Sequence, residues 1–87
     1  MTERSATIIN DLGLHARPAA QFVRMASQFQ ATIELCRDDN AVNGKSIMGV
    51  MMLAAECGAV VRVRADGADE VAAVEALVAL IERGFGE

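Results

Sequence analysis

The 87-residue sequence has no tryptophan or tyrosine, and it contains one proline, one histidine and two cysteines. With few aromatic rings and a net charge of −4, it lacks the stacking platform and the basic surface that bind nucleic acid. One histidine and two cysteines are too few for the common four-ligand zinc site. We therefore expect no nucleic acid and no metal, and we expect reduced, mostly buried thiols at Cys36 and Cys57.

Long apolar runs are also missing. No stretch approaches the roughly 20 apolar residues of a membrane-spanning helix, and the first ten residues lack the apolar core of a targeting peptide. We expect no membrane insertion and a cytoplasmic location. Apolar residues still make up 53% of the chain, too many for a disordered segment. Residues 1–87 are expected to form one domain with a small core of Val, Ile, Leu, Met and Ala.

The hydrophobic pattern predicts the element order β-α-β-β-α-β-α. The expected strands are Ala6–Asn10, Thr32–Arg37, Ala41–Asn43 and Ala59–Ala65. The first helix begins near Pro18, with apolar positions Ala19, Phe22, Val23, Ala26 and Phe29, and the second covers Ser46 to about Ala55. The last helix follows Asp69, has a stripe of Val71, Val74, Leu77, Val78 and Ile81, and ends at Gly84. Single apolar faces predict an α+β domain, with the helices on one side of a mostly antiparallel sheet.

The most informative segment is Gly13-Leu14-His15-Ala16-Arg17-Pro18. Proline is tolerated in the first turn of a helix, so His15 is expected at or next to the N-cap. The first backbone amides of a helix have no helical acceptors and face the positive end of the dipole, which favours an anion there. Arg17 adds a fixed positive charge, and a neutral imidazole is a good nucleophile. His15 and Arg17 are therefore candidate catalytic residues, with Ala16 and Pro18 supporting a phosphoryl cradle.

This segment, together with Gly44-Lys45-Ser46-Ile47-Met48-Gly49, resembles the HPr family of the bacterial phosphotransferase system, and the resemblance runs the whole chain. It implies a four-stranded open-faced β-sandwich with three helices on one face. It also implies that His15 accepts a phosphoryl group through Nδ1 from phosphoenolpyruvate-charged Enzyme I and passes it to an EIIA-type domain. Such a carrier is a reactant in each transfer cycle more than a turnover enzyme, and it needs no cofactor.

Ser46 has two compatible interpretations. Its position before the second helix predicts an N-cap, worth about 1 kcal/mol. The surrounding segment also resembles the target of the HPr kinase/phosphatase, so regulatory phosphorylation at Ser46 is expected. Because a phosphate is tolerated at a helix N-terminus, it would act by changing the docking surface.

The second helix is apolar on almost every side, and a short helix cannot bury all of its faces against one sheet. Flexible methionines suit surfaces that bind several partners. We therefore expect a docking surface for partners, with Arg17 also on its basic rim, formed by Leu14, Ala20, Arg24, Lys45, Ile47, Met48, Met51 and Met52. A monomer follows, because this surface is reserved for partners. The acidic residues Asp66, Asp69, Glu70, Glu75 and Glu82 are expected on a solvated face elsewhere.

Several alternatives remain open. Leu12 and the ending Gly84-Phe85-Gly86 resemble the nitrogen-related branch, NPr, whereas the Ser46 segment resembles kinase-controlled HPr proteins, so sugar uptake and nitrogen regulation both fit. A non-carrier interaction protein controlled through Ser46 would share the fold and the docking surface. A small ligand-sensing domain shares the order β-α-β-β-α-β, but not the His-x-Arg-Pro segment.

Overall fold

The computed structural model describes every residue from Met1 to Glu87. The strands are β1 (Thr2–Thr7), β2 (Thr32–Arg37), β3 (Asn40–Asn43) and β4 (Val60–Asp66). The helices are α1 (Ala16–Ala26), α2 (Ile47–Met52) and α3 (Glu70–Glu82), followed by a short 3₁₀ turn, η1 (Gly84–Gly86). The four strands form one antiparallel sheet in the order β1-β4-β2-β3. The expected α+β class and element order are confirmed.

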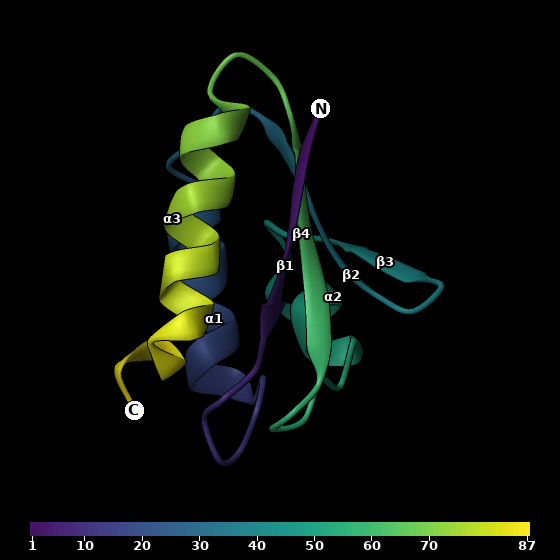
Figure 1. Cartoon of the computed structure of the whole chain (residues 1–87), viewed down its shortest axis with the longest axis vertical. Coiled ribbons are helices and arrows are strands. Elements are labelled where there is room, and N and C mark those ends of the chain that lie inside the picture. Colours follow the sequence, from purple (N-terminus) through teal and green to yellow (C-terminus); the bar gives the residue numbers. More distant parts are fainter.

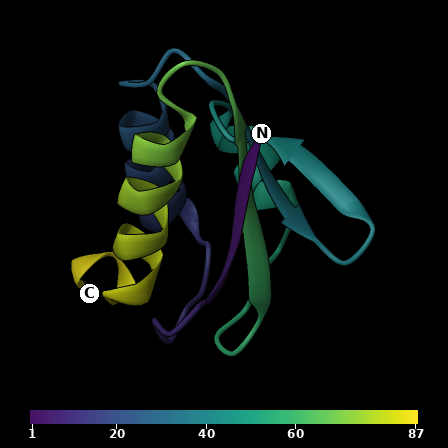
Figure 2. The ribbon, with the colours of Figure 1, turned by 45° about the horizontal axis from the view of Figure 1, so that its top comes forward.

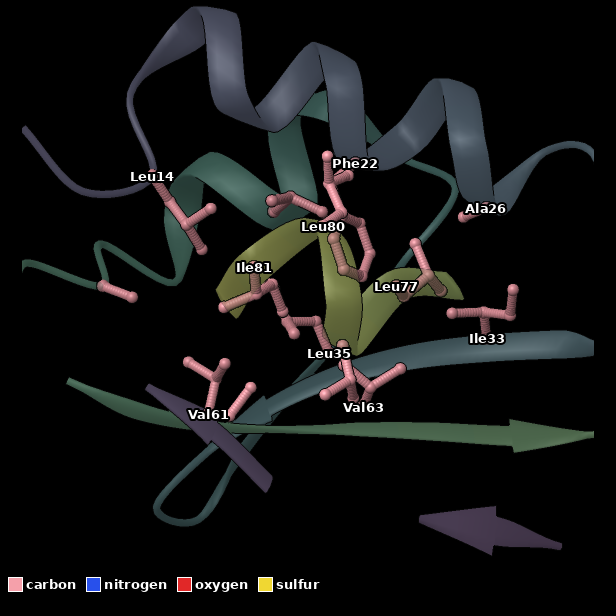
Figure 3. Packing of buried hydrophobic residues seen from close by; sticks show 14 of the residues in the cluster. Leu14, Phe22, Ala26, Ile33, Leu35, Val61, Val63, Leu77, Leu80 and Ile81 are labelled. Carbon is pink, nitrogen blue, oxygen red and sulfur yellow. The ribbon is translucent and has the colours of Figure 1, made fainter. Parts of the chain in front are cut away.

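The core lies between the sheet and the helices. Figure 1 shows α1 and α3 side by side on one side of the sheet, and Figure 2 shows the same layers from a second angle. Phe22 of α1 points from the helix layer toward Leu35 and Val63 of the strands (Figure 3), and all three are fully buried. Val61 and Val63 alternate with the half-buried Arg62 and Arg64 on β4, which is the pattern of a strand with one solvated face.

The first strand was predicted too late in the chain. The sequence favoured Ala6–Asn10, but β1 covers Thr2–Thr7 and pairs along its whole length with β4. It carries little apolar signal because its outward residues are polar, and Glu3 bonds to Arg64 across the sheet at 3.0 Å. The ladder of β4 satisfies its backbone groups, and this long-range pairing is not visible in the local pattern.

The helices differ from the expectations in detail. α1 begins at Ala16 and ends at Ala26, so Phe29 lies beyond it and packs against the core from the following turn. α2 ends at Met52, because Ala54 has a left-handed φ of +53° and does not continue the helix. On α3, Val71 is 56% exposed and does not belong to the buried stripe. Gly84 follows α3 with φ +65°, which confirms the predicted glycine cap.

The two cysteines are free, but only Cys36 is buried, whereas Cys57 is exposed. The expectation for Cys57 was wrong because it lies in the loop between α2 and β4, not under a helix. No helix of the structure is long and apolar enough to cross a membrane.

Candidate functional site

His15 is the N-cap residue of α1, as the position of Pro18 predicted. Its backbone is extended (φ −76°, ψ −170°), and its side chain makes no capping hydrogen bond to the helix. Ala19 N donates to His15 O at 3.0 Å, which closes the first turn. Pro18 has no backbone N–H, so it adds no donor without an acceptor to this turn. The amides of Ala16 and Arg17 make no hydrogen bond within the chain, so both remain available at the positive end of the helix.

The imidazole of His15 is held from one side only. Its Nε2 lies 3.3 Å from Oε1 and 3.2 Å from Oε2 of Glu87, while Nδ1 has no hydrogen-bond partner in the chain. The side chain is 35% exposed, so a second protein can reach the ring. Arg17 is exposed within the first turn of α1. A nucleophilic nitrogen, two free amides and a guanidinium therefore lie within three residues, an arrangement suited to holding a phosphoryl group.

Glu87 is a site residue that the sequence did not predict. Its carboxylate also accepts a hydrogen bond from Asn10 Nδ2 at 3.2 Å. The hydrogen bond from His15 is the main reason that the pKa of the Glu87 carboxyl lies below its ordinary value, and Asn10 and the charge of Arg17 act in the same direction. No local pattern could have found this contact, because 72 positions separate His15 from Glu87.

The loop before His15 is fixed by its backbone. Leu14 N donates to Ala55 O at 2.9 Å, and Asn10 Nδ2 donates to Gly13 O at 2.7 Å. Leu14 itself is only 5% exposed and belongs to the core (Figure 3), so its predicted role in partner docking is wrong. The reason is that an apolar residue next to the site anchors the loop in the core, and this leaves no surface for a partner.

Other predicted docking residues are accessible. On α2, Ile47, Met48, Met51 and Met52 are 46%, 73%, 41% and 77% exposed, which confirms the expected surface methionines. Ala20 and Lys45 are half-buried, and Lys45 Nζ donates to Phe29 O at 2.7 Å. Arg24 lines a groove between α1 and α3, together with Gln21, Gln28, Met25, Leu80 and Arg83.

Ser46 is the N-cap of α2, as predicted, and its Oγ accepts a hydrogen bond from Gly49 N at 3.0 Å. The acidic residues are less uniform than the sequence suggested. Asp69 accepts hydrogen bonds from Gln30 N and Ala31 N, at 2.8 and 2.9 Å, and so joins α3 to the turn before β2. Glu70 accepts from Thr2 Oγ1 at 2.6 Å and from Gly67 N at 3.1 Å. These two side chains are structural contacts, because the fold brings them to distant backbone and side-chain donors.

Known proteins resemble this chain over nearly its whole length. The sequence profile described as "PTS HPr component phosphorylation site" matches residues 2–83. The chain is 52% identical to the phosphocarrier protein HPr of Neisseria meningitidis serogroup A, over 100% of this chain and 98% of that protein.

Two solved structures extend the agreement to three dimensions. HPr-C-His from Thermoanaerobacter tengcongensis superposes with a TM-score of 0.96 at 52% identity, over 100% of this chain and 98% of that one. An HPr dimer from the same organism superposes with a TM-score of 0.79 at 52% identity, over 100% of both chains. The four-stranded sheet, the three helices and the site at the start of α1 are thus accompanied by full-length sequence similarity, and the chain belongs to the HPr family of phosphotransferase-system phosphocarriers.

Proposed function

We propose that this chain accepts a phosphoryl group on Nδ1 of His15 from phosphoenolpyruvate-charged Enzyme I and passes it to an EIIA-type domain. The observation that carries the proposal is the N-cap geometry of α1. The ring occupies the N-cap without capping the helix, and the amides of Ala16 and Arg17 stay free beside it. An anion bound to the ring would meet unpaired donors and the positive end of an 11-residue helix.

Arg17 supplies the charge that this geometry lacks. A phosphoryl group in transfer carries negative charge on its outer oxygens, and a guanidinium donates to such oxygens as a planar fork. Arg17 lies two residues after His15, in the first turn of α1, and its guanidinium is free of intrachain ion pairs. No pocket is needed, because the partner protein provides the other half of the transfer site.

The surface beside the site supports transfer between proteins. The exposed Met48 and Met52 belong to α2, which packs next to α1. Exposed apolar side chains of this kind are typical of interaction surfaces, and methionine adapts to more than one partner. We propose that the exposed residues of α2 dock both the phosphoryl donor and the phosphoryl acceptor, and that the chain acts in the cytoplasm as a monomer.

Ser46 is a candidate second phosphorylation site, at which the carrier would be regulated. Its Oγ caps α2, and Ser46 directly precedes the exposed Ile47 and Met48. A kinase-added phosphate there would place about two negative charges next to the methionines and oppose binding of an acidic partner. We propose regulatory phosphorylation at Ser46 by an HPr kinase/phosphatase, in addition to transfer through His15. Sugar uptake and nitrogen regulation are both compatible with this chemistry.

The test is phosphorylation of the purified chain by phosphoenolpyruvate and a bacterial Enzyme I, read by intact mass and acid lability. A single acid-labile phosphate that is absent from His15→Ala is the expected result. Arg17→Ala should keep the phosphorylation site but slow transfer. No phosphate with Enzyme I from either the sugar or the nitrogen branch would refute the proposal. In that case Ser46 and the methionine surface would favour the non-carrier interaction protein.

A further inference from the structure

An open groove of about 250 Å³ lies between α1 and α3, which run side by side (Figure 1). Its lining combines polar and apolar side chains from both helices: Gln21, Arg24, Met25 and Gln28 of α1, and Leu80 and Arg83 from α3 and its C-cap. Leu80 is only 4% exposed and Met25 is half-buried, whereas both arginines are exposed. The groove therefore offers guanidinium and amide donors above an apolar floor.

The groove is positively charged, although the net charge of the chain is −4. Arg24 and Arg83 form no ion pair within the chain, and no aspartate or glutamate lines the groove. On the sheet, by contrast, Arg37, Arg62 and Arg64 are each paired with a glutamate. Two guanidiniums thus share one groove without an internal counter-charge.

The helix ends explain part of this charge. Arg24 lies in the last turn of α1 and Arg83 is the C-cap of α3, and the dipole of a helix favours a cation near its C-terminus. The dipole acts on each arginine separately, however. It does not require the two side chains to line the same groove, or Gln21 and Gln28 to line it with them. The combination of donors in one place therefore points to a ligand.

We infer that this groove binds a small organic phosphate, that is, a phosphate monoester with a short carbon skeleton. A guanidinium donates to two phosphate oxygens at once as a planar fork, and such charge-assisted hydrogen bonds are among the strongest in proteins. The side-chain NH₂ groups of Gln21 and Gln28 donate to the remaining oxygens. Met25 and Leu80 contact the carbon skeleton, because removing its apolar surface from water is favourable.

The size of the groove restricts the ligand. Sites for drug-sized molecules have volumes of about 300–1,000 Å³ and enclose most of the ligand, whereas this groove is smaller and open to solvent. It suits a short ester such as glycerol 3-phosphate and does not enclose a nucleotide. Because both guanidiniums are exposed, solvent and salt screen their charge. We therefore expect a dissociation constant of about 1 mM that rises with ionic strength.

The groove is distinct from the candidate phosphoryl site at His15. The free amides of Ala16 and Arg17 lie at the N-terminus of α1, whereas Arg24 lies in the last turn of this helix and shares its groove with α3. The inference does not depend on the proposed carrier function, since a chain that accepts no phosphate from Enzyme I would keep the groove. Both positions attract anions, so the experiment has to separate them.

The first experiment is an NMR titration of the ¹⁵N-labelled chain with glycerol 3-phosphate at constant ionic strength. The side-chain NH₂ groups of Gln21 and Gln28 and the Nε–H groups of Arg24 and Arg83 report on the groove directly. Their signals should shift together and saturate with one dissociation constant of about 1 mM. Glycerol, which carries no charge, should shift none of them, and inorganic phosphate should bind more weakly because it makes no contact with the apolar floor. Shifts confined to the free amides at the start of α1, or no saturable shift of the groove signals, would overturn the proposal.

The second experiment compares Arg24→Gln and Arg83→Gln with Arg4→Gln, the matched control. Arg4 is exposed on β1, forms no ion pair and does not line the groove, so its removal changes the net charge equally. Each groove variant should raise the dissociation constant about fivefold, less than a buried charge-assisted hydrogen bond provides, because both guanidiniums are exposed. Arg4→Gln should bind as the native chain does, and all three variants should keep the native Tm because the replaced side chains lie on the surface. Equal affinities in the three variants would show that only net charge matters and would overturn the proposal.

Discussion

Replacing Gly13 with alanine tests whether backbone packing holds His15 at the start of α1. Gly13 has φ +64°, a conformation that glycine adopts without strain and alanine does not. A Cβ at this position would lie 2.3 Å from Ala55 O and 2.9 Å from Glu56 Cα. Both are backbone atoms, so no side-chain rotation relieves the overlap, and the loop that carries His15 must move away from Ala55.

The cost of this substitution follows from two contributions. The left-handed conformation costs alanine about 1–2 kcal/mol. Moving the loop breaks the hydrogen bond from Leu14 N to Ala55 O, which contributes about 1 kcal/mol net. Gly13→Ala should therefore lower the free energy of unfolding by about 2–3 kcal/mol. For a domain of this length, that corresponds to a fall in Tm of about 8–24 °C.

Gly58→Ala is the matched control. Gly58 also has a positive φ, +94°, but a Cβ there would meet nothing within 4 Å. Like Gly13→Ala, Gly58→Ala introduces backbone strain and lowers the conformational entropy of the unfolded chain. Unlike Gly13→Ala, it creates no steric overlap with the backbone. Urea and thermal unfolding of both variants isolate the effect of the overlap, and Gly13→Ala should also accept phosphate from Enzyme I more slowly. Equal stability of the two variants would refute the argument that Gly13 is required by close backbone contact.

Three further predictions follow from the contacts described above. The pKa of Glu70 is lowered to about 2, first by the hydrogen bond from Thr2, so the stability it provides is present above pH 4.5 and is lost as the pH falls toward 2. The difference in Tm between the native chain and Glu70→Gln should accordingly become smaller as the pH is lowered from 7 to 3. A difference that stays constant over this range would contradict the assigned stabilising role of the Glu70 carboxylate. Phe22→Ala should lower the free energy of unfolding by about 3–5 kcal/mol in urea titrations, because the ring is fully buried, and a loss below about 1 kcal/mol would show that the core refills the space. Met48→Ser combined with Met52→Ser should change stability by less than about 1 kcal/mol but weaken binding to Enzyme I, measured by calorimetry, and unchanged binding would exclude these side chains from the interface.

The sequence predicted those features that depend on neighbours in the chain. Pro18 restricts the start of α1, so the N-cap position of His15 and the free amides of the first turn could be expected from residue order alone. Ser46 before an apolar segment indicated the cap of α2 for the same reason. The alternation on β4 identified its buried face, because side chains on a strand point to opposite sides in turn.

The tertiary structure alone decided the features that join distant segments. Glu87 reaches His15 because η1 folds back onto the start of α1, and Leu14 is core because the loop that carries it packs on Ala55. β1 pairs with β4 despite its polar sequence. The side chain of Asp69 does not cap its own helix, α3, but accepts hydrogen bonds from the backbone of the turn after α1. The local pattern of residues thus determined that the His15 side chain lies at the N-terminus of α1. Which partner orients that side chain was decided by contacts between residues more than 70 positions apart, and no local periodicity records such contacts.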